Sequence, residues 1–352
     1  MIAKYLFDVP SGFILFSEFL LSAAMLLLSG FFVTQYSKKI SSGLGLSRLW
    51  VGMMLLAPLS SAGEFISSIG AITIIRAPDL AFGDLFGSNL FNLMILCFLI
   101  PALTSRTPLL STKGIFHERD ILLSVWGIVL MVISMKGIFL TESVPKSLYF
   151  IFSLLIAIVY FGGIRLLSSY EKMESGGETV TPSAGPNQMM IWIYFLVWGG
   201  AMVFSGLWMT LISDQIALYP FNLFGNKILL GHSFVGTLFL AVVTSLDEVV
   251  IAISAIRLSA SELTIGTIFG SNLVNLFFIP ILDIIYRLKY GVPIFFDVRS
   301  IHLFTGMVVI VLTVIGVGGI LYRSKVRKGF GFDTIAMALI YLVSTYILFR
   351  LR

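Results

Sequence analysis

The chain has 352 residues, of which 58% are hydrophobic and only 12% are charged. Soluble domains carry about 25% charged residues, so this composition excludes an ordinary soluble domain. Apolar runs of about 20 residues, the length of a transmembrane helix, follow one another along the chain, and their continuity argues against a β-barrel. The net charge of +5 is spread over the loops, which argues against a nucleic-acid partner. We predict an all-α polytopic membrane protein whose partner is the lipid bilayer.

The apolar runs predict ten transmembrane helices, near residues 11–35, 47–75, 79–103, 119–139, 146–168, 189–212, 228–256, 262–287, 300–322 and 331–350. The second and seventh spans are long and carry polar residues in the middle, so we expect these helices to be tilted, bent or broken. The N-terminus has no basic segment followed by a small-residue cleavage site, and the first run is therefore predicted to be a true span.

A polar segment rich in Gly, Ser, Pro and Glu, residues 168–188, divides the chain into halves of five spans each. We expect a first repeat at 1–167, a cytoplasmic linker at 168–188 and a second repeat at 189–352. Because five is an odd number, the second half must enter the membrane in the opposite orientation. Placing both termini outside the cytoplasm puts more than half of the 23 Lys and Arg residues in cytoplasmic loops. This predicts a cell (plasma or inner) membrane protein with extracytoplasmic termini.

Two nonapeptides support the duplication. LFGSNLFNL at 85–93 returns as IFGSNLVNL at 268–276, with two conservative changes. Upstream of each copy stands an element with two hydroxyl residues, two further residues and a Glu, SSAGE in the first half and TSLDE in the second. We place the duplicated regions at about 57–100 and 241–285.

Acidic residues fall within the predicted spans at Glu18, Glu64, Asp84, Asp247, Glu248 and Asp283. A carboxylate at the bilayer centre costs about 2.5–3.5 kcal/mol or more, so each needs a partner or a wet cavity. No span carries Lys or Arg at a depth that would neutralise Glu64 and Glu248, and a mobile cation is the simplest partner. Glu18 and Asp283 lie outside the duplicated motifs themselves, and we expect them to line or support the site.

Helical spacing places further oxygens beside each Glu. Residues three and four apart share a helix face. The two hydroxyl residues before each Glu therefore lie on the same face as that Glu, and the Ser of each GSN motif lies on the same face as the last Asn of its motif. The residues so placed are Ser60, Ser61, Ser88, Asn92, Thr244, Ser245, Ser271 and Asn275. This all-oxygen set suits hard cations such as Ca²⁺, Na⁺, Mg²⁺ or Mn²⁺ rather than zinc or copper. The small residues Gly83, Gly87, Gly266 and Gly270 would let the helices approach closely.

These motifs resemble those of the cation/Ca²⁺ antiporter superfamily, most closely its Na⁺/Ca²⁺ exchanger branch. LSSAGE (59–64) and VTSLDE (243–248) are similar to its GTSLPE-like element, and GSNLFN (87–92) and GSNLVN (270–275) are similar to its second element. The resemblance implies that Glu64 and Glu248 are the central cation ligands. It also implies that spans one and six form a sliding gate pair and that the surrounding ligands are Ser60, Ser61, Ser88, Asn92, Thr244, Ser245, Ser271 and Asn275.

The chain departs from the family pattern at three places. The last position of the second element is Asn in both repeats, where one repeat of the family often has Asp. The family Pro is replaced by Gly63 and Asp247, and Asp84 stands where a neutral polar residue is usual. We infer that carboxylates have moved, with Asp247 or Asp84 restoring a third negative charge at the metal site.

A site of two or three carboxylates is costly to occlude when empty and nearly neutral when loaded, which predicts antiport rather than enzyme activity. We expect no cofactor; the partners are inorganic cations, with Ca²⁺ exchanged for Na⁺ by alternating access. Crowded carboxylates also favour proton binding, so an H⁺-coupled divalent cation exchanger is the main alternative. An intramembrane protease fits less well, because AFGD at 81–84 lacks the first Gly of GxGD. A channel would not explain the inverted duplication.

Overall fold

The computed structural model describes residues 12–43, 61–106, 118–175, 188–223, 226–246, 248–249, 261–326 and 332–351. Eight of its helices are long and apolar enough to cross a membrane. They are α2 (Gly12–Gly43), α6 (Pro78–Arg106), α7 (Glu118–Phe139), α8 (Phe150–Ser175), α9 (Gln188–Leu218), α13 (Ser261–Tyr290), α14 (Ile301–Val326) and α15 (Phe332–Leu351). The all-α membrane fold expected from composition is confirmed.

The second and seventh spans are irregular, as their polar centres predict. The described part of span two is α5 (Ala62–Gly70) followed by a π-helical turn, η2 (Ala71–Ile75). The described part of span seven includes α10 (His232–Phe234), the π-helical η5 (Val235–Leu240) and α11 (Ala241–Thr244). π-Helical turns are rare in proteins, and those that occur are often found at functional sites.

Both irregular spans leave helical geometry at the same repeat position. Ser61, just before α5, has φ −87° and ψ 12°, and Ser245, just after α11, has φ −90° and ψ 10°. These values lie in the bridge region between helix and strand. Each Ser stands three residues before the motif Glu, so the change of backbone direction sits beside Glu64 and Glu248.

Two local features differ from the expected plan. Between α9 and α10 the chain forms a short antiparallel hairpin of β1 (Phe221–Leu223) and β2 (Asn226–Ile228), in which Phe221 pairs with Ile228. α8 continues to Ser175, so the first part of the segment expected to be linker is helical. Short 3₁₀ turns, η4 (Lys146–Leu148) and η6 (Ile294–Asp297), precede α8 and α14.

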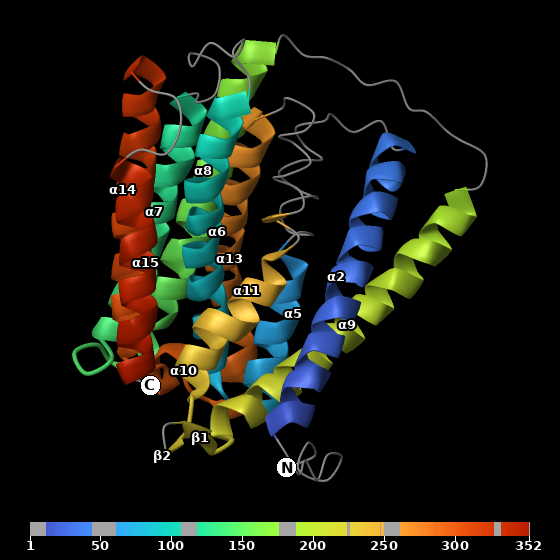
Figure 1. Ribbon diagram of the computed structural model, residues 1–352, viewed down its shortest axis with the longest axis vertical. Coiled ribbons are helices and arrows are strands. Elements are labelled where there is room, and N and C mark those ends of the chain that lie inside the picture. Colours follow the sequence, from blue (N-terminus) through green and yellow to red (C-terminus); the bar gives the residue numbers. More distant parts are fainter. Residues whose placement is uncertain are drawn as a thin grey trace.

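The helices form a compact bundle with one pair set apart from it (Figure 1). α6, α7, α8, α13, α14 and α15 stand together, and α5, α10 and α11 lie between this bundle and the pair α2 and α9. The first residues of α2 and the last residues of α15 lie at the same end of the molecule. α2 and α9 run in opposite directions, as inverted repeats require.

The pair α2 and α9 is held together by apolar and aromatic contacts. Phe32 stacks on Trp198 with ring centroids 4.2 Å apart, and Tyr36 stacks on Tyr194 at 5.5 Å. Most of the remaining surface of both helices is exposed and apolar, as expected for helices that face lipid. In contrast, the Pro78–Cys97 part of α6 is almost entirely buried, so it lies at the centre of the bundle.

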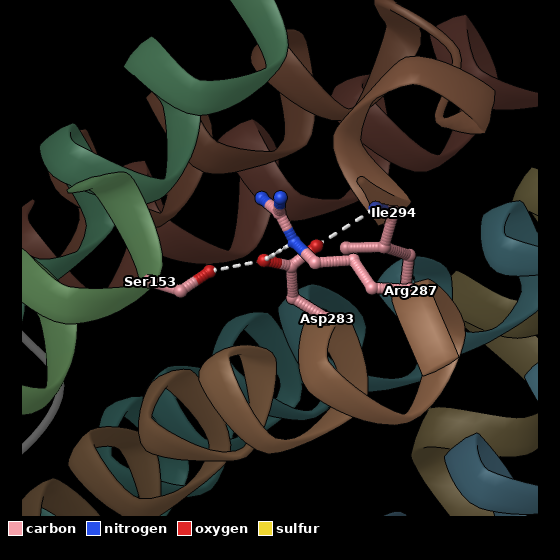
Figure 2. Close-up of polar contacts among 4 residues, drawn as sticks. All are labelled: Ser153, Asp283, Arg287 and Ile294. Carbon is pink, nitrogen blue, oxygen red and sulfur yellow. Dashed lines mark hydrogen bonds and ion pairs between the residues drawn. The ribbon is translucent and has the colours of Figure 1, made fainter. Parts of the chain in front are cut away.

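A buried ion pair, which lies away from the centre of the bundle, links α13 to α8 and to the turn before α14 (Figure 2). Asp283 on α13 is 1% exposed. Its Oδ2 accepts hydrogen bonds from Ser153 Oγ of α8 at 2.6 Å and from Arg287 Nε at 2.8 Å, and its Oδ1 accepts one from the backbone N of Ile294 at 2.9 Å. The carboxylate is therefore satisfied by protein donors, which assigns Asp283 a structural role.

Replacing Asp283 with Ala is expected to destabilise the fold by about 3–5 kcal/mol, because Arg287 then keeps a partly buried charge without its partner. Thermal unfolding in detergent measures this effect. Adding Arg287→Ala should cost little more, since the stranded charge is removed at the same time. Equal and additive losses from the two substitutions would contradict the assignment.

Candidate functional site

The predicted ligands meet at the centre of the bundle, where α6 and α13 cross between the ends of α5 and α11. The side chains are 0–6% exposed, so the site is closed to solvent in this structure. The predicted ones come from both halves of the chain: Ser61, Glu64, Asp84, Ser88 and Asn92 from the first, and Thr244, Ser245, Glu248, Ser271 and Asn275 from the second. Two further Asn residues, Asn89 and Asn272, lie among them.

The two Glu carboxylates are joined to hydroxyls across the repeats. Ser245 Oγ donates to Glu64 Oε1 at 3.0 Å, so a hydroxyl of span seven meets the Glu of span two. Ser271 Oγ donates to Glu248 Oε1 at 2.7 Å and lies 2.6 Å from Ser61 Oγ. The network therefore links α5, α13 and the chain that follows α11, as a shared site requires.

Asp84 lies at the edge of this network and is satisfied by hydroxyls. Its Oδ1 accepts a hydrogen bond from Thr244 Oγ1 at 3.0 Å, and its Oδ2 accepts one from Ser67 Oγ. Ser88 Oγ, one turn further along α6, lies 3.4 Å from Thr244 Oγ1. Because Ser67 Oγ also contacts the backbone O of Glu64, Asp84 adds a third carboxyl group to the neighbourhood of Glu64.

The four Asn residues of the two GSN motifs form reciprocal bridges between α6 and α13. Asn92 Nδ2 donates to Asn272 Oδ1 at 3.0 Å, and Asn275 Nδ2 donates to Asn89 Oδ1 at 3.1 Å. These two bonds are related by the inverted repeat, because Asn89 and Asn272 occupy the same place in the two motifs.

Several buried acceptors at the centre have no donor among the described residues. They are Glu64 Oε2, Asn92 Oδ1 and Asn275 Oδ1. A buried acceptor without a partner costs about 1–3 kcal/mol. Carboxylate and amide oxygens are the ligands that hard cations such as Ca²⁺ and Na⁺ prefer, so these three atoms are available to hold a cation.

Two of the site carboxylates, Glu64 and Asp84, have no basic partner within the described part of the chain. In that part, ion pairs join Arg76 to Asp297, His232 to Asp214, Arg287 to Asp283 and His302 to Asp79. The described His, Cys, Asp and Glu residues also form no group of three that could hold a metal by themselves. A cation here would be held by carboxylates mixed with amides and hydroxyls.

Glycines bring α6 against η5 with direct backbone contact. A Cβ atom built on Gly87 would lie 2.5 Å from Thr237 O and 2.8 Å from Ala241 Cβ, and one on Gly83 would lie 3.0 Å from Gly236 Cα. This confirms the close approach predicted for Gly83 and Gly87. It also places Asp84 and Ser88, on the same stretch of α6, beside Thr244.

Gly87→Ala is expected to destabilise the protein by about 1–3 kcal/mol, because the new methyl group has no room between two backbones. Gly162→Ala on α8 is the matched control, since nothing lies within 4 Å of its Cβ position. Melting temperatures of the two purified variants provide the measurement. If both melt at the temperature of the wild type, the close-packing interpretation is wrong.

The structure brings together most of the residues predicted from the sequence. Ser60 and Asp247 lie outside the described residues, and the ligand roles of all the predicted residues stay predictions. Three polar contributors to the network were not predicted: Ser67, Asn89 and Asn272. Asn89 and Asn272 were visible as the repeated N of GSN, but the i,i+4 argument selected only the Ser and the last Asn of each motif.

Comparisons with known proteins agree with this architecture. The chain matches the family described as sodium/calcium exchanger protein over residues 14–167 and 190–350. It is 24% identical over 234 residues to the inner membrane protein YrbG of Escherichia coli (strain K12), covering 66% of this chain and 67% of that protein.

Three solved structures share the fold at low sequence identity. The H⁺/Ca²⁺ exchanger CAX aligns over 99% of this chain and 87% of its own, with 12% identity and a TM-score of 0.66. YfkE covers 94% and 91%, with 16% identity and a TM-score of 0.65. The sodium-calcium exchanger NCX_Mj covers 95% and 98%, with 15% identity and a TM-score of 0.57. The chain is therefore a multi-pass membrane protein that belongs to the sodium/calcium exchanger family, within the cation/Ca²⁺ antiporter superfamily of transporters.

Proposed function

We propose that this protein is a secondary-active antiporter that exchanges Ca²⁺, or a similar divalent cation, for Na⁺ across the cell membrane. The observation that carries the proposal is the set of buried acceptors without donors, Glu64 Oε2, Asn92 Oδ1 and Asn275 Oδ1. They come from both repeats and lie in a network that already contains Glu248 and Asp84.

The charge of the site favours exchange over one-way release. An empty site holding several carboxylates is costly to enclose between packed helices. One divalent cation, or several Na⁺ ions bound to the same oxygens, neutralises most of this charge. The loaded protein therefore changes conformation more readily than the empty one, and each ion must displace the other.

Alternating access would come from the α2 and α9 pair moving against the bundle. Both helices pack against the site helices on one side and face lipid on the other. Ser29 on α2 and Ser205 on α9 bond to carbonyls of their own helices. Their hydroxyls are therefore directed along the helix and do not cross to the bundle. The polar contacts that a sliding motion would have to break or carry along include those of α9, from Thr210 Oγ1 to the Ser67 O of α5 at 3.2 Å and between Asp214 and His232 of α10 at 2.7 Å.

A proton is the alternative coupling ion. The H⁺/Ca²⁺ exchanger CAX and the Ca²⁺/H⁺ antiporter YfkE share the fold, and carboxylates held close together also bind protons. NCX_Mj, named as a sodium-calcium exchanger, shares the same fold. At these identities likeness of fold does not select the coupling ion, so the two gradients must be compared directly.

Flux in proteoliposomes tests the proposal. Uptake of ⁴⁵Ca²⁺ is measured with an outward Na⁺ gradient at equal pH on both sides, and separately with a pH gradient and no Na⁺. We expect uptake driven by Na⁺ and stopped by a Na⁺ ionophore. Uptake with the pH gradient alone would select the H⁺-coupled alternative, and no uptake with either gradient would overturn the proposed exchange. Adding Mn²⁺ or Mg²⁺ as a competitor identifies the preferred divalent ion.

A further inference from the structure

The bridges between the four Asn residues determine which end of each ligand amide faces the ion. An Asn side chain ends in an oxygen that attracts a cation and an NH₂ group of similar size that repels it. The same residue can therefore help or hinder binding, depending on its rotation. In this chain the rotation of the amide matters in both repeats, because the last position of each GSN motif is Asn.

The direction of the Asn89 amide is set by a backbone group. Asn89 Nδ2 donates to the backbone O of Asn272 at 3.2 Å, and a backbone carbonyl can only accept. Asn89 Oδ1 must then point the other way, where it receives Asn275 Nδ2 at 3.1 Å. With its NH₂ group occupied, Asn275 is left with a buried Oδ1 that has no donor.

The bond between Asn92 and Asn272 has the same direction, although within the described part of the chain only the Asn89 amide is anchored by a backbone group. Asn92 gives its Nδ2 to Asn272 Oδ1 at 3.0 Å, and its Oδ1 is likewise buried with no donor among the described residues. All four side chains are at most 6% exposed, so water does not replace these bonds in the closed site. Both free oxygens belong to residues that share a helix face with Ser88 or Ser271.

We propose that Asn89 and Asn272 are positioning residues for cation binding: they hold the amides of Asn275 and Asn92 with oxygen, not nitrogen, available to the ion. The proposal rests on the proposed function and adds residues that do not themselves ligate the cation. Groups that orient a ligand in this way commonly change metal affinity by about 10–100-fold. Without the bridge, the amide can rotate and present its NH₂ group to the cation.

The test combines a loss with a rescue. Asn89→Leu keeps the approximate size of the side chain but removes both of its hydrogen bonds. We expect the Kd of purified protein for Ca²⁺ and the half-saturation concentration of transport to rise by about 10–100-fold, with a smaller change in maximal rate. In an Asn275→Asp background, where either rotation presents an oxygen, the same substitution should change both values less than about threefold.

A control separates positioning from packing. Thr313→Val alters a residue that lines a pocket together with Asn89 and Asn272, but Thr313 bonds only to the Val309 carbonyl of its own helix, so we expect wild-type affinity. An equal loss of affinity for Asn89→Leu in both backgrounds, or no loss in either, would overturn the proposal. If Asn89→Leu does not fold, Asn272→Leu with and without Asn92→Asp is read in the same way.

Binding is measured by calorimetry on protein in detergent, so it does not depend on transport. A wild type that binds Ca²⁺ but moves it under neither gradient overturns the exchange proposal and leaves the positioning test valid. A wild type that transports Ca²⁺, with an Asn89→Leu variant of unchanged affinity, overturns the positioning proposal alone. Absence of Ca²⁺ binding by the folded wild type overturns both.

Discussion

Glu64→Gln and Glu248→Gln are each expected to abolish cation exchange while leaving the fold largely intact. Gln has the size of Glu and retains an oxygen that can accept the existing bond, from Ser245 in one case and Ser271 in the other. What is lost is one negative charge beside the cation. Two unit charges about 4 Å apart interact by about 4 kcal/mol at an effective dielectric constant of 20.

Part of this energy is offset, because a neutral side chain is easier to bury than a charged one. We still expect exchange to fall by more than about 100-fold, which corresponds to a loss of about 2.8 kcal/mol. The measurement is ⁴⁵Ca²⁺ uptake in proteoliposomes containing equal amounts of folded protein. Glu142→Gln, on the exposed turn between α7 and α8, is the matched control and should transport at the wild-type rate. Full activity of either site variant would refute the model of the site.

Asp84→Asn is expected to reduce by one the number of coupling cations exchanged for each divalent ion. The substitution keeps the size of the side chain, and an amide can accept from one of Ser67 and Thr244 while donating to the other. The local network therefore survives, but the site loses the charge that this chain carries in place of a neutral residue. Fewer cations are then needed to bring the loaded site close to neutrality.

The stoichiometry is read from the equilibrium that the transporter reaches. In proteoliposomes held at a series of Na⁺ ratios, or pH differences, the logarithm of the final Ca²⁺ ratio gives a line whose slope reports the coupling. We expect a lower slope for Asp84→Asn. The double variant Asp84→Thr, Thr267→Asp moves the charge to the matching position of the second repeat and should restore the slope. An unchanged slope in Asp84→Asn would show that Asp84 does not take part in the charge balance.

Much of the fold was predictable because the same sequence motifs occur in both halves of the chain. The continuous apolar runs predicted the spans, and the duplicated motifs with an odd number of spans predicted their inversion. The polar centres of spans two and seven predicted their irregularity, which the structure shows as bridge-region backbone at Ser61 and Ser245. These features could be predicted because each depends on residues that are close together in the sequence.

The contacts between helices were less predictable. Asn89 meets Asn275, and Asn92 meets Asn272, only because α6 and α13 cross in opposite directions at one particular register. Ser67 bonds to Asp84 because α5 packs against α6. Spacing within one helix contains no information on such a register. The hairpin before α10 was missed for a related reason, because six paired residues in a short apolar segment give little periodicity.

The bond between Ser67 and Asp84 breaks the equivalence of the two halves. At the matching positions the second half has Ile251 and Thr267, which cannot form a carboxylate–hydroxyl pair. In an inverted repeat with identical halves, the inward-open and outward-open states would be related by a two-fold rotation and would have equal free energy. Here they differ, so the resting protein is expected to favour one opening. Gradients alone fix the final ion distribution, but the protein would respond most sensitively to ion concentrations on a single face of the membrane.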